Sequence, residues 1–155
     1  MPTPRTGQAR IHVEASPELV YGMVADLPRM GEWSPECRAV EWVGEPGGAA
    51  TGQAFRGHNQ LGPYKWTMRG RVVVADPGRE FAFATLEGDG DGTRWRYRFE
   101  HSGTGTDVVE SYEVVNEPWY VRLANLVVPR GRLLQRGMQQ TLERIKAAAE
   151  AAARP

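Results

Sequence analysis

Several features that would define a function are scarce in this sequence. Cysteine occurs once, as Cys37, so no disulfide can form within the chain and no cysteine cluster can bind a metal. Lys and Arg total 19, as do Asp and Glu, and this neutral balance gives no indication of an electrostatic nucleic-acid binder. No apolar run approaches the ~20 residues that span a bilayer, and the N-terminus lacks the apolar core of a secretion signal. We therefore expect a cytoplasmic protein with no nucleic-acid partner and no stable membrane insertion.

Metal and cofactor chemistry also has little support in the sequence. The histidines His12, His58 and His101 fall in different predicted strands, and by alternation all of them point outward. The glycine-rich stretch 88–92 is not followed by a helix, so it is typical of a hairpin rather than of a phosphate-binding loop. No serine lies in a G-x-S-x-G setting. We expect no metal site and no cofactor.

The length and the first residues indicate a single domain. A chain of 155 residues fits one hydrophobic core, and a domain of this size buries roughly two thirds of its unfolded surface. We expect one domain over residues 1–155, in which the polar, proline-containing residues 1–8 form a loose lead-in. Residues 9–14 alternate like a half-buried strand. Ser16 and Pro17 then predict a helix start, and a second short helix is expected near residues 30–35.

The rest of the chain divides into strands and then a helix. Between residues 38 and 115, six predicted strands are separated by short Gly/Pro turns, which is typical of an antiparallel meander. After Pro118 the apolar period becomes helical, with a break expected at Pro129. The predicted fold class is α+β, with a curved antiparallel sheet of about seven strands wrapped around a long C-terminal helix. Two short helices lie between the first and second strands.

Large apolar residues share the inward face of this sheet. Trp95, Tyr97 and Phe99 alternate with outward-facing arginines, and the neighbouring strands repeat the pattern. One helix cannot cover so many aromatic residues, so we expect an apolar cavity between sheet and helix. The residues expected to line it are Trp33, Phe55, Asn59, Trp66, Met68, Phe83, Trp95, Tyr97, Phe99, Glu110, Tyr112, Leu126, Leu134 and Met138.

Glu110 is the candidate catalytic residue of this face. The register that places Val108 and Val114 inside also places Glu110 and Tyr112 inside, where a carboxylate is costly unless it is hydrogen-bonded or protonated. In one interpretation, Glu110 with Tyr112 and Asn59 orients a ligand or transfers a proton. In the alternative, Glu110 pairs with Arg122, Arg132 or Arg136, or a bulge turns it outward.

The order of elements and several local motifs resemble the SRPBCC superfamily, which has the START-type helix-grip fold. The resemblance runs from about residue 11 to residue 149 and is closest to the branch described as polyketide cyclase/dehydrase and lipid transport. The motifs that carry it are ASPELVY at 15–21, MGEWSPE at 30–36, GQAFRGHN at 52–59, WT at 66–67, DPGREF at 76–81 and GTDVVESY at 105–112.

The resemblance implies a small hydrophobic ligand, such as a lipid, a polyketide or another aromatic or isoprenoid molecule. We favour a binding or transport protein over an enzyme, with the loop 44–53 and the turn 61–63 as candidate lids. The first alternative is a cyclase or dehydratase that uses Glu110 as general acid/base, which a Glu110 without an arginine partner would favour. The second is an interaction domain similar to Hsp90 activators, which an exposed apolar patch would favour. The sequence also leaves a homodimer open.

Overall fold

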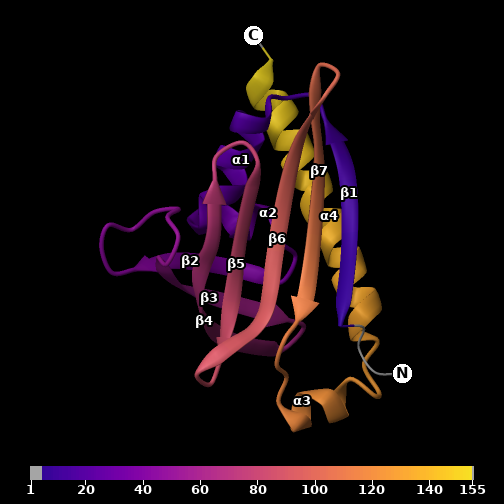
Figure 1. The fold of residues 1–155 in the computed structure, drawn as a ribbon. Coiled ribbons are helices and arrows are strands. Elements are labelled where there is room, and N and C mark those ends of the chain that lie inside the picture. Colours follow the sequence, from indigo (N-terminus) through magenta and orange to yellow (C-terminus); the bar gives the residue numbers. More distant parts are fainter. Residues whose placement is uncertain (1–4, 155) are drawn as a thin grey trace.

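The computed structural model describes residues 5–154 and confirms the predicted architecture. A seven-stranded antiparallel sheet in the order β1-β7-β6-β5-β4-β3-β2 curves around the long helix α4 (Figure 1). The elements are, in chain order, β1 (Thr6–Val13), α1 (Pro17–Ala25), a 3-10 turn η1 (Leu27–Arg29), α2 (Met30–Trp33), β2 (Cys37–Val43), β3 (Ala54–Leu61), β4 (Tyr64–Asp76), β5 (Glu80–Glu87), β6 (Gly90–Ser102), β7 (Gly105–Val114), α3 (Trp119–Ala124) and α4 (Arg130–Ala153).

Strand β1 begins earlier than the sequence pattern indicates. Residues 6–8, which we expected in the loose lead-in, belong to the strand because they pair with residues 111–113 near the end of β7. Pairing satisfies the backbone groups of these polar residues, and alternation of the side chains alone does not report it. The remainder of the expected lead-in, residues 1–4, lies outside the described residues.

Helix α1 closes one end of the sheet. The Ser16 hydroxyl accepts a hydrogen bond from the Leu19 backbone N–H at 3.2 Å, a helix cap that contributes about 1 kcal/mol. The cap starts α1 where its apolar side packs onto the sheet, and Val20 and Val24 are fully buried. The ring of Tyr21 meets Phe99 edge-on at 5.6 Å between centroids. The result is a closed aromatic and aliphatic cluster under α1.

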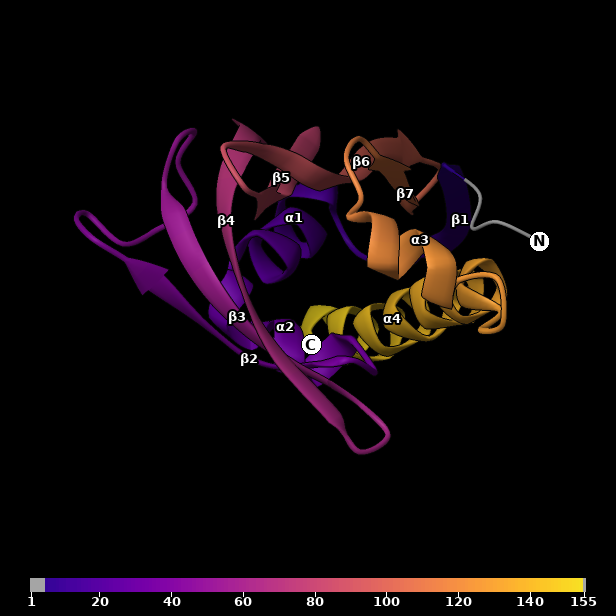
Figure 2. The same cartoon turned by 90° about the horizontal axis from the view of Figure 1, so that it is seen from below.

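Helix α4 lies across the concave side of the sheet (Figure 2). Its inward stripe consists of Met138, Leu142, Ile145 and Ala149, all of which are at most 2% exposed. The spacing of three to four residues between them is the helical period that the sequence shows. The chain breaks before this helix at Pro129, as predicted.

The sheet bends where β3 and β4 swing away from β5. Gly70 of β4 makes this bend possible, because a Cβ at that position would lie 2.3 Å from Cζ of Phe55. The Phe55 ring therefore occupies the space over Gly70, and its edge meets Phe83 of β5 at 5.5 Å between centroids. A register shift between Val72 and Val74 adds to the twist of the same strand.

The two ends of the concave face differ, and we name them by their elements. The upper end holds α1, the turn between β6 and β7, and the C-terminal part of α4, whereas the lower end holds α3 and the first residues of β1 and α4 (Figure 1). None of the α3 residues is buried. Among the described residues, no helix is both long enough and apolar enough to cross a membrane.

Candidate functional site

Two rows of inward-facing residues cross the middle of the concave face. Strand pairing places Ala9, Glu110, Tyr97 and Phe81 side by side on neighbouring strands in the first row. One step nearer the lower end, the second row consists of Gly7, Tyr112, Trp95, Phe83 and Val72. Because side chains alternate along each strand, both rows point toward α4. The site is therefore a strip of aromatic side chains with one carboxyl group in it.

Glu110 lies inside the protein with only one hydrogen-bond partner. Its side chain is 3% exposed, and the hydroxyl of Tyr97 donates to its Oε1 at 2.7 Å. Among the described residues, its second oxygen, Oε2, has no hydrogen-bond partner and is buried. The alternative in which Glu110 pairs with an arginine is wrong. Arg122, Arg132 and Arg136 are exposed, and among the described residues none of them forms a salt bridge with Glu110. The bulge alternative is wrong as well, because β6 and β7 pair without a register shift.

Burial sets the charge of this group. Removal from water raises the pKa of Glu110 to about 8, although the hydrogen bond from Tyr97 acts in the opposite direction. Burial and the neighbouring Glu110 also raise the pKa of Tyr97 well above its usual value. Near pH 7 the carboxyl group is therefore neutral and carries an O–H, which lets it donate a hydrogen bond as well as accept one.

Part of the second row is tightly packed. The rings of Trp95 and Tyr112 lie 5.4 Å apart between centroids. Tyr112 also lies over Gly7, where an added Cβ would be 2.6 Å from its Cε1 atom. Gly7 is thus needed for the Tyr112 ring to keep its place beside Trp95, to which it is tilted by 44°. Unlike Tyr112, both Trp95 and Phe83 are only half-buried.

Most of the residues predicted for the lining are buried or half-buried, but they do not form one site: Asn59 and Trp66 line the hollow at the free end of β3 and β4, which does not reach Glu110. The buried ones are Trp33, Phe55, Tyr97, Phe99, Glu110, Tyr112 and Met138, and the half-buried ones are Asn59, Trp66, Met68, Phe83, Trp95 and Leu134. The prediction for Leu126 is wrong. This residue lies in the turn after α3 and is 55% exposed, because the chain leaves the helical period before Pro129.

Sequence reasoning missed two features of the site. Gly7 gave no signal, because its importance depends on pairing with a strand about a hundred residues away. Trp33 was predicted as a lining residue, but the sequence did not show that its indole Nε1 is buried without a hydrogen-bond partner among the described residues.

The loop 44–53, which we expected as a candidate lid, is held at its base, because the Gln53 amide donates to the Val43 carbonyl at 2.9 Å. At the lower end of the molecule lie α3 and the turn after it, and not the loop 44–53 (Figure 1).

Open hollows lie elsewhere on the sheet. One of about 410 Å³ crosses β1, β7, β6 and β5, and another of about 470 Å³ lies at the free end of β3 and β4. Both are lined mainly by outward-facing residues, and neither reaches Tyr97 or Glu110. Neither hollow is therefore the apolar cavity that the sequence predicts between sheet and helix.

A curved sheet that grips one long helix, with an aromatic interior, defines a helix-grip domain. The chain belongs to the family described as polyketide cyclase / dehydrase and lipid transport, whose model matches residues 5–150. No curated protein sequence matches the chain.

Solved structures agree on the fold. The Zhui aromatase/cyclase from Streptomyces sp. R1128 is 20% identical, with 97% of this chain and 96% of that chain covered and a TM-score of 0.71. The di-domain aromatase/cyclase StfQ from the steffimycin biosynthetic pathway is 15% identical, with 96% of this chain and 51% of that chain covered and a TM-score of 0.76. The Polyketide_cyc-like protein Cgl2372 from Corynebacterium glutamicum is 29% identical, with 99% and 91% covered and a TM-score of 0.54.

Proposed function

We propose that this protein binds a small hydrophobic molecule that carries a hydroxyl or carbonyl oxygen, and that Glu110 hydrogen-bonds to that oxygen. The observation that carries this proposal is the buried, unpartnered Oε2 atom of Glu110. Buried polar groups in native proteins nearly always have a partner, because an unmade hydrogen bond costs about 1–3 kcal/mol. A bound ligand supplies the missing partner.

The rest of the strip supports a ligand that is otherwise apolar. Around Glu110 lie Tyr97, Phe81 and, one step lower, Trp95 and Tyr112. Binding sites for small molecules are mostly apolar and aromatic, with a few polar groups that fix the orientation. A flat aromatic or polycyclic molecule would stack on these rings, which already lie at stacking and edge distances from each other and would have to move apart to admit it.

The route to Glu110 runs through the lower row. Trp95, Phe83 and Leu134 point inward yet remain half-exposed. Residues at the same depth toward the upper end, such as Phe81, are fully buried. A ligand that enters from below would cover the exposed part of the lower row and come to rest at Glu110.

The test uses a matched pair of probes. Binding of 1,8-dihydroxyanthraquinone and of plain anthraquinone is followed by quenching of tryptophan fluorescence in the wild type and in Glu110→Gln and Glu113→Gln. Glu113 is exposed on the same strand and serves as the control. We expect the wild type and the control to prefer the hydroxylated probe and Glu110→Gln to lose most of that preference. Equal affinity of the wild type for both probes would contradict the role of Glu110, and no binding of either would contradict the site.

A second candidate function has one specific observation in its favour. Glu110 has no arginine partner, and its pKa of about 8 lets it exchange a proton near neutral pH. We propose, as the alternative to simple binding, that it acts as the acid in a dehydration. It would protonate the leaving hydroxyl of a β-hydroxy ketone, so that the C–O bond breaks, water leaves and a C=C bond forms as the α-proton is lost to solvent.

The assay for this alternative follows 4-hydroxy-4-phenylbutan-2-one, whose dehydration product is conjugated and absorbs in the ultraviolet. Catalysis that falls as the pH rises through about 8 and that disappears in Glu110→Gln would support the acid role. A rate equal to that without protein, together with tight binding of the hydroxylated probe above, would leave binding as the function.

A further inference from the structure

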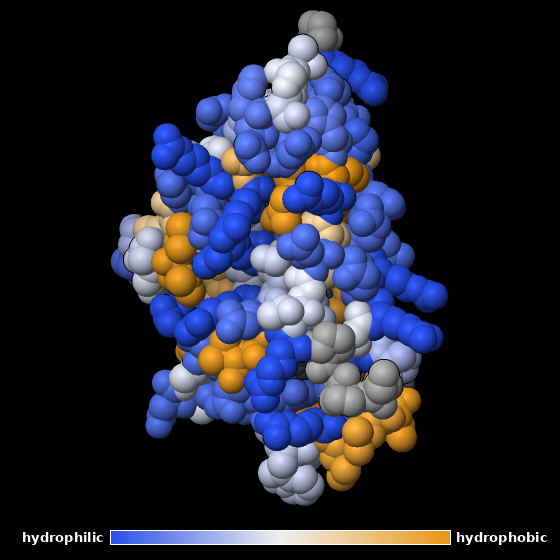
Figure 3. Space-filling view, turned by 45° about the vertical axis from the view of Figure 1, so that its right-hand side comes forward, coloured by the Kyte–Doolittle hydropathy of each residue, from blue (hydrophilic) through white to orange (hydrophobic). Residues whose placement is uncertain are grey.

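The lower end of the molecule carries a group of apolar side chains that the fold does not cover. We call α3 and the turn after it, residues 119–128, the lower apolar segment. Its exposed large residues, with their exposed fractions, are Trp119 75%, Tyr120 59%, Val121 36%, Leu123 59%, Leu126 55%, Val127 85% and Val128 39%. Hydrophobic side chains gather at this end of the surface (Figure 3). Contiguous patches of this kind on a soluble domain mark a contact surface.

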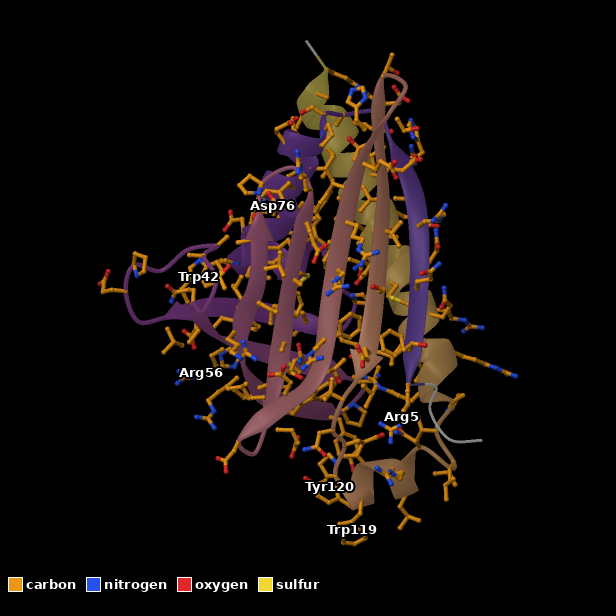
Figure 4. All side chains as sticks on the ribbon, viewed as in Figure 1. Arg5, Trp42, Arg56, Asp76, Trp119 and Tyr120 are labelled. Carbon is orange, nitrogen blue, oxygen red and sulfur yellow. The ribbon has the colours of Figure 1, made fainter. Side chains whose placement is uncertain are left out.

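The segment points away from the body of the protein. Trp119 and Tyr120 extend from the lowest part of the molecule (Figure 4). The segment is nevertheless held in place at its base, since the Asn125 amide donates to the Glu117 carboxylate and Asn125 is buried. The exposed face is thus presented on a short, anchored helix.

Positive charge surrounds this surface. Between residues 115 and 136 the sequence has Arg122, Arg130, Arg132 and Arg136, and Glu117 is the single acidic residue. Arg130 is paired with Glu36, whereas Arg122, Arg132 and Arg136 form no salt bridge among the described residues. Arg5, whose guanidinium donates to the Val114 carbonyl at 3.3 Å, lies at the same end (Figure 4). Apolar side chains are therefore flanked by unpaired cations.

We propose that the lower apolar segment docks on the surface of an anionic lipid bilayer, and that the hydrophobic ligand passes between bilayer and protein there. Trp and Tyr prefer the boundary between lipid headgroups and acyl chains, and arginines nearby bind the headgroup phosphates. The contact is peripheral: the segment lies in the interface and does not cross the membrane.

The position of the lower apolar segment would allow a ligand to pass directly between the bilayer and the protein interior. Leu134 lies in the first turns of α4, at the same end of the molecule as α3, and the half-exposed Trp95 and Phe83 belong to the second row, the nearer of the two rows to that end. A ligand that is poorly soluble in water can then move from the bilayer into the interior without crossing bulk solvent. This part of the inference rests on the proposed binding function, while the docking itself does not.

The experiment is co-sedimentation of the whole protein with vesicles. Phosphatidylcholine vesicles are compared with vesicles in which about one third of that lipid is replaced by anionic phosphatidylglycerol. We expect binding to the anionic vesicles that weakens as salt is added, and at least about tenfold weaker binding for Val127→Asp and for the double variant Arg122→Glu with Arg132→Glu. All three sites are exposed, so these variants should fold normally.

Matched controls place the same chemistry elsewhere. Val43→Asp changes an apolar residue that is 40% exposed at the end of β2, and Arg10→Glu reverses a charge on the outer side of β1. Both should bind vesicles like the wild type. Equal loss in the controls, or equal binding of the wild type to neutral and anionic vesicles, would overturn the proposal.

Dimerisation and ligand binding are measured on the same protein, and each decides a different part of the proposal. If the wild type forms a dimer that Val127→Asp dissociates, and neither binds vesicles, the segment is an interface with a second copy or another protein and the proposal is overturned. The fluorescence titration with 1,8-dihydroxyanthraquinone is made on the same samples without lipid. Ligand binding without vesicle binding overturns the docking alone, and vesicle binding without ligand binding overturns the proposed function alone.

Discussion

The two ends of the concave face are built from the same kinds of residue but are packed differently. At the upper end, Phe81 and Val108 of the sheet and Ile145 of α4 are fully buried. At the lower end, Trp95 and Leu134 point the same way but stay half-exposed, and the segment that follows β7 turns its apolar residues outward. The upper end therefore serves stability, because buried apolar area is what stabilises the fold.

The polar groups follow the same division. Glu110 lies where the two ends meet. It is buried, but it belongs to the row next to the one that contains the half-exposed Trp95. A protein that needed only stability would have filled this boundary with an apolar residue, since burying a carboxyl group costs free energy. Under the proposed function, part of the folding free energy is given up at the lower end in exchange for a place where a ligand can bind.

The largest expected effect comes from truncating matched residues at the two ends. Phe81→Ala leaves a cavity in the closed core and should lower the free energy of unfolding by about 3–5 kcal/mol. Leu126→Ala, at the lower end, should change it by less than about 0.5 kcal/mol because the side chain is largely in solvent. Urea denaturation measures both. Similar costs for the two variants would show that the ends do not differ as described.

The next effect concerns the boundary group. The pKa of Glu110 is higher in the folded protein, about 8, than its usual 4.5, so the folded state holds the proton more tightly. The stability this group contributes is fully present below pH 4.5 and is lost as the pH rises toward 8. Relative to Glu110→Gln, the wild type should lose up to about 1.4 kcal/mol per pH unit across that window.

Denaturation of both proteins at a series of pH values gives this difference directly. Glu113→Gln is the control, since it removes an exposed carboxyl group from the same strand. Parallel stability curves for the wild type and Glu110→Gln would mean that the carboxyl group is ionised inside the protein or is not buried.

Two glycines allow a comparison between a tightly packed position, Gly7, and one with open space around it, Gly22. Gly7→Ala places a methyl group against the Tyr112 ring and should destabilise the protein by about 1–3 kcal/mol as the ring moves. Gly22→Ala, on the exposed side of α1 with open space around it, should stabilise by up to about 1 kcal/mol. Thermal unfolding compares the two, and a neutral Gly7→Ala would show that the second row has room to spare.

The last comparison sets Trp95, in the second row, against Phe81 in the closed core. Because its side chain is half-exposed, Trp95→Ala should cost about 1–2 kcal/mol, less than Phe81→Ala, although tryptophan is the larger residue. The same variant should bind hydroxyanthraquinone much more weakly. A cost equal to that of Phe81→Ala, with unchanged binding, would place Trp95 in the structural core instead.

The fold was accessible from the sequence because its signals are local. Turn residues mark the strand ends, and alternation gives the inward face, so Trp95, Tyr97 and Glu110 were assigned to the correct side. What the sequence could not give depends on contacts between distant segments. Leu126 and Leu134 share a helical spacing, but only Leu134 packs against the core, because α3 ends at Ala124 and the chain turns before α4 begins at Arg130.

The state of Glu110 shows the same limit. Its inward direction follows from alternation, but whether one of the arginines Arg122, Arg132 and Arg136 meets it depends on where α3 and α4 lie. Likewise, the fit of Tyr112 over Gly7 requires the register between the first strand and the last. Each of these features was decided by tertiary packing, which no short stretch of sequence reports.

The most direct test of the account is to locate a ligand on the concave face by NMR. Aromatic and methyl signals of the protein are followed as 1,8-dihydroxyanthraquinone is added. We predict shifts for Phe83, Trp95 and Tyr112, and none beyond small changes for Phe99, Val108 and Ile145. Shifts confined to the upper end, or to residues of the outer face such as Arg94 and Arg96, would contradict a binding site that opens at the lower end and reaches Glu110.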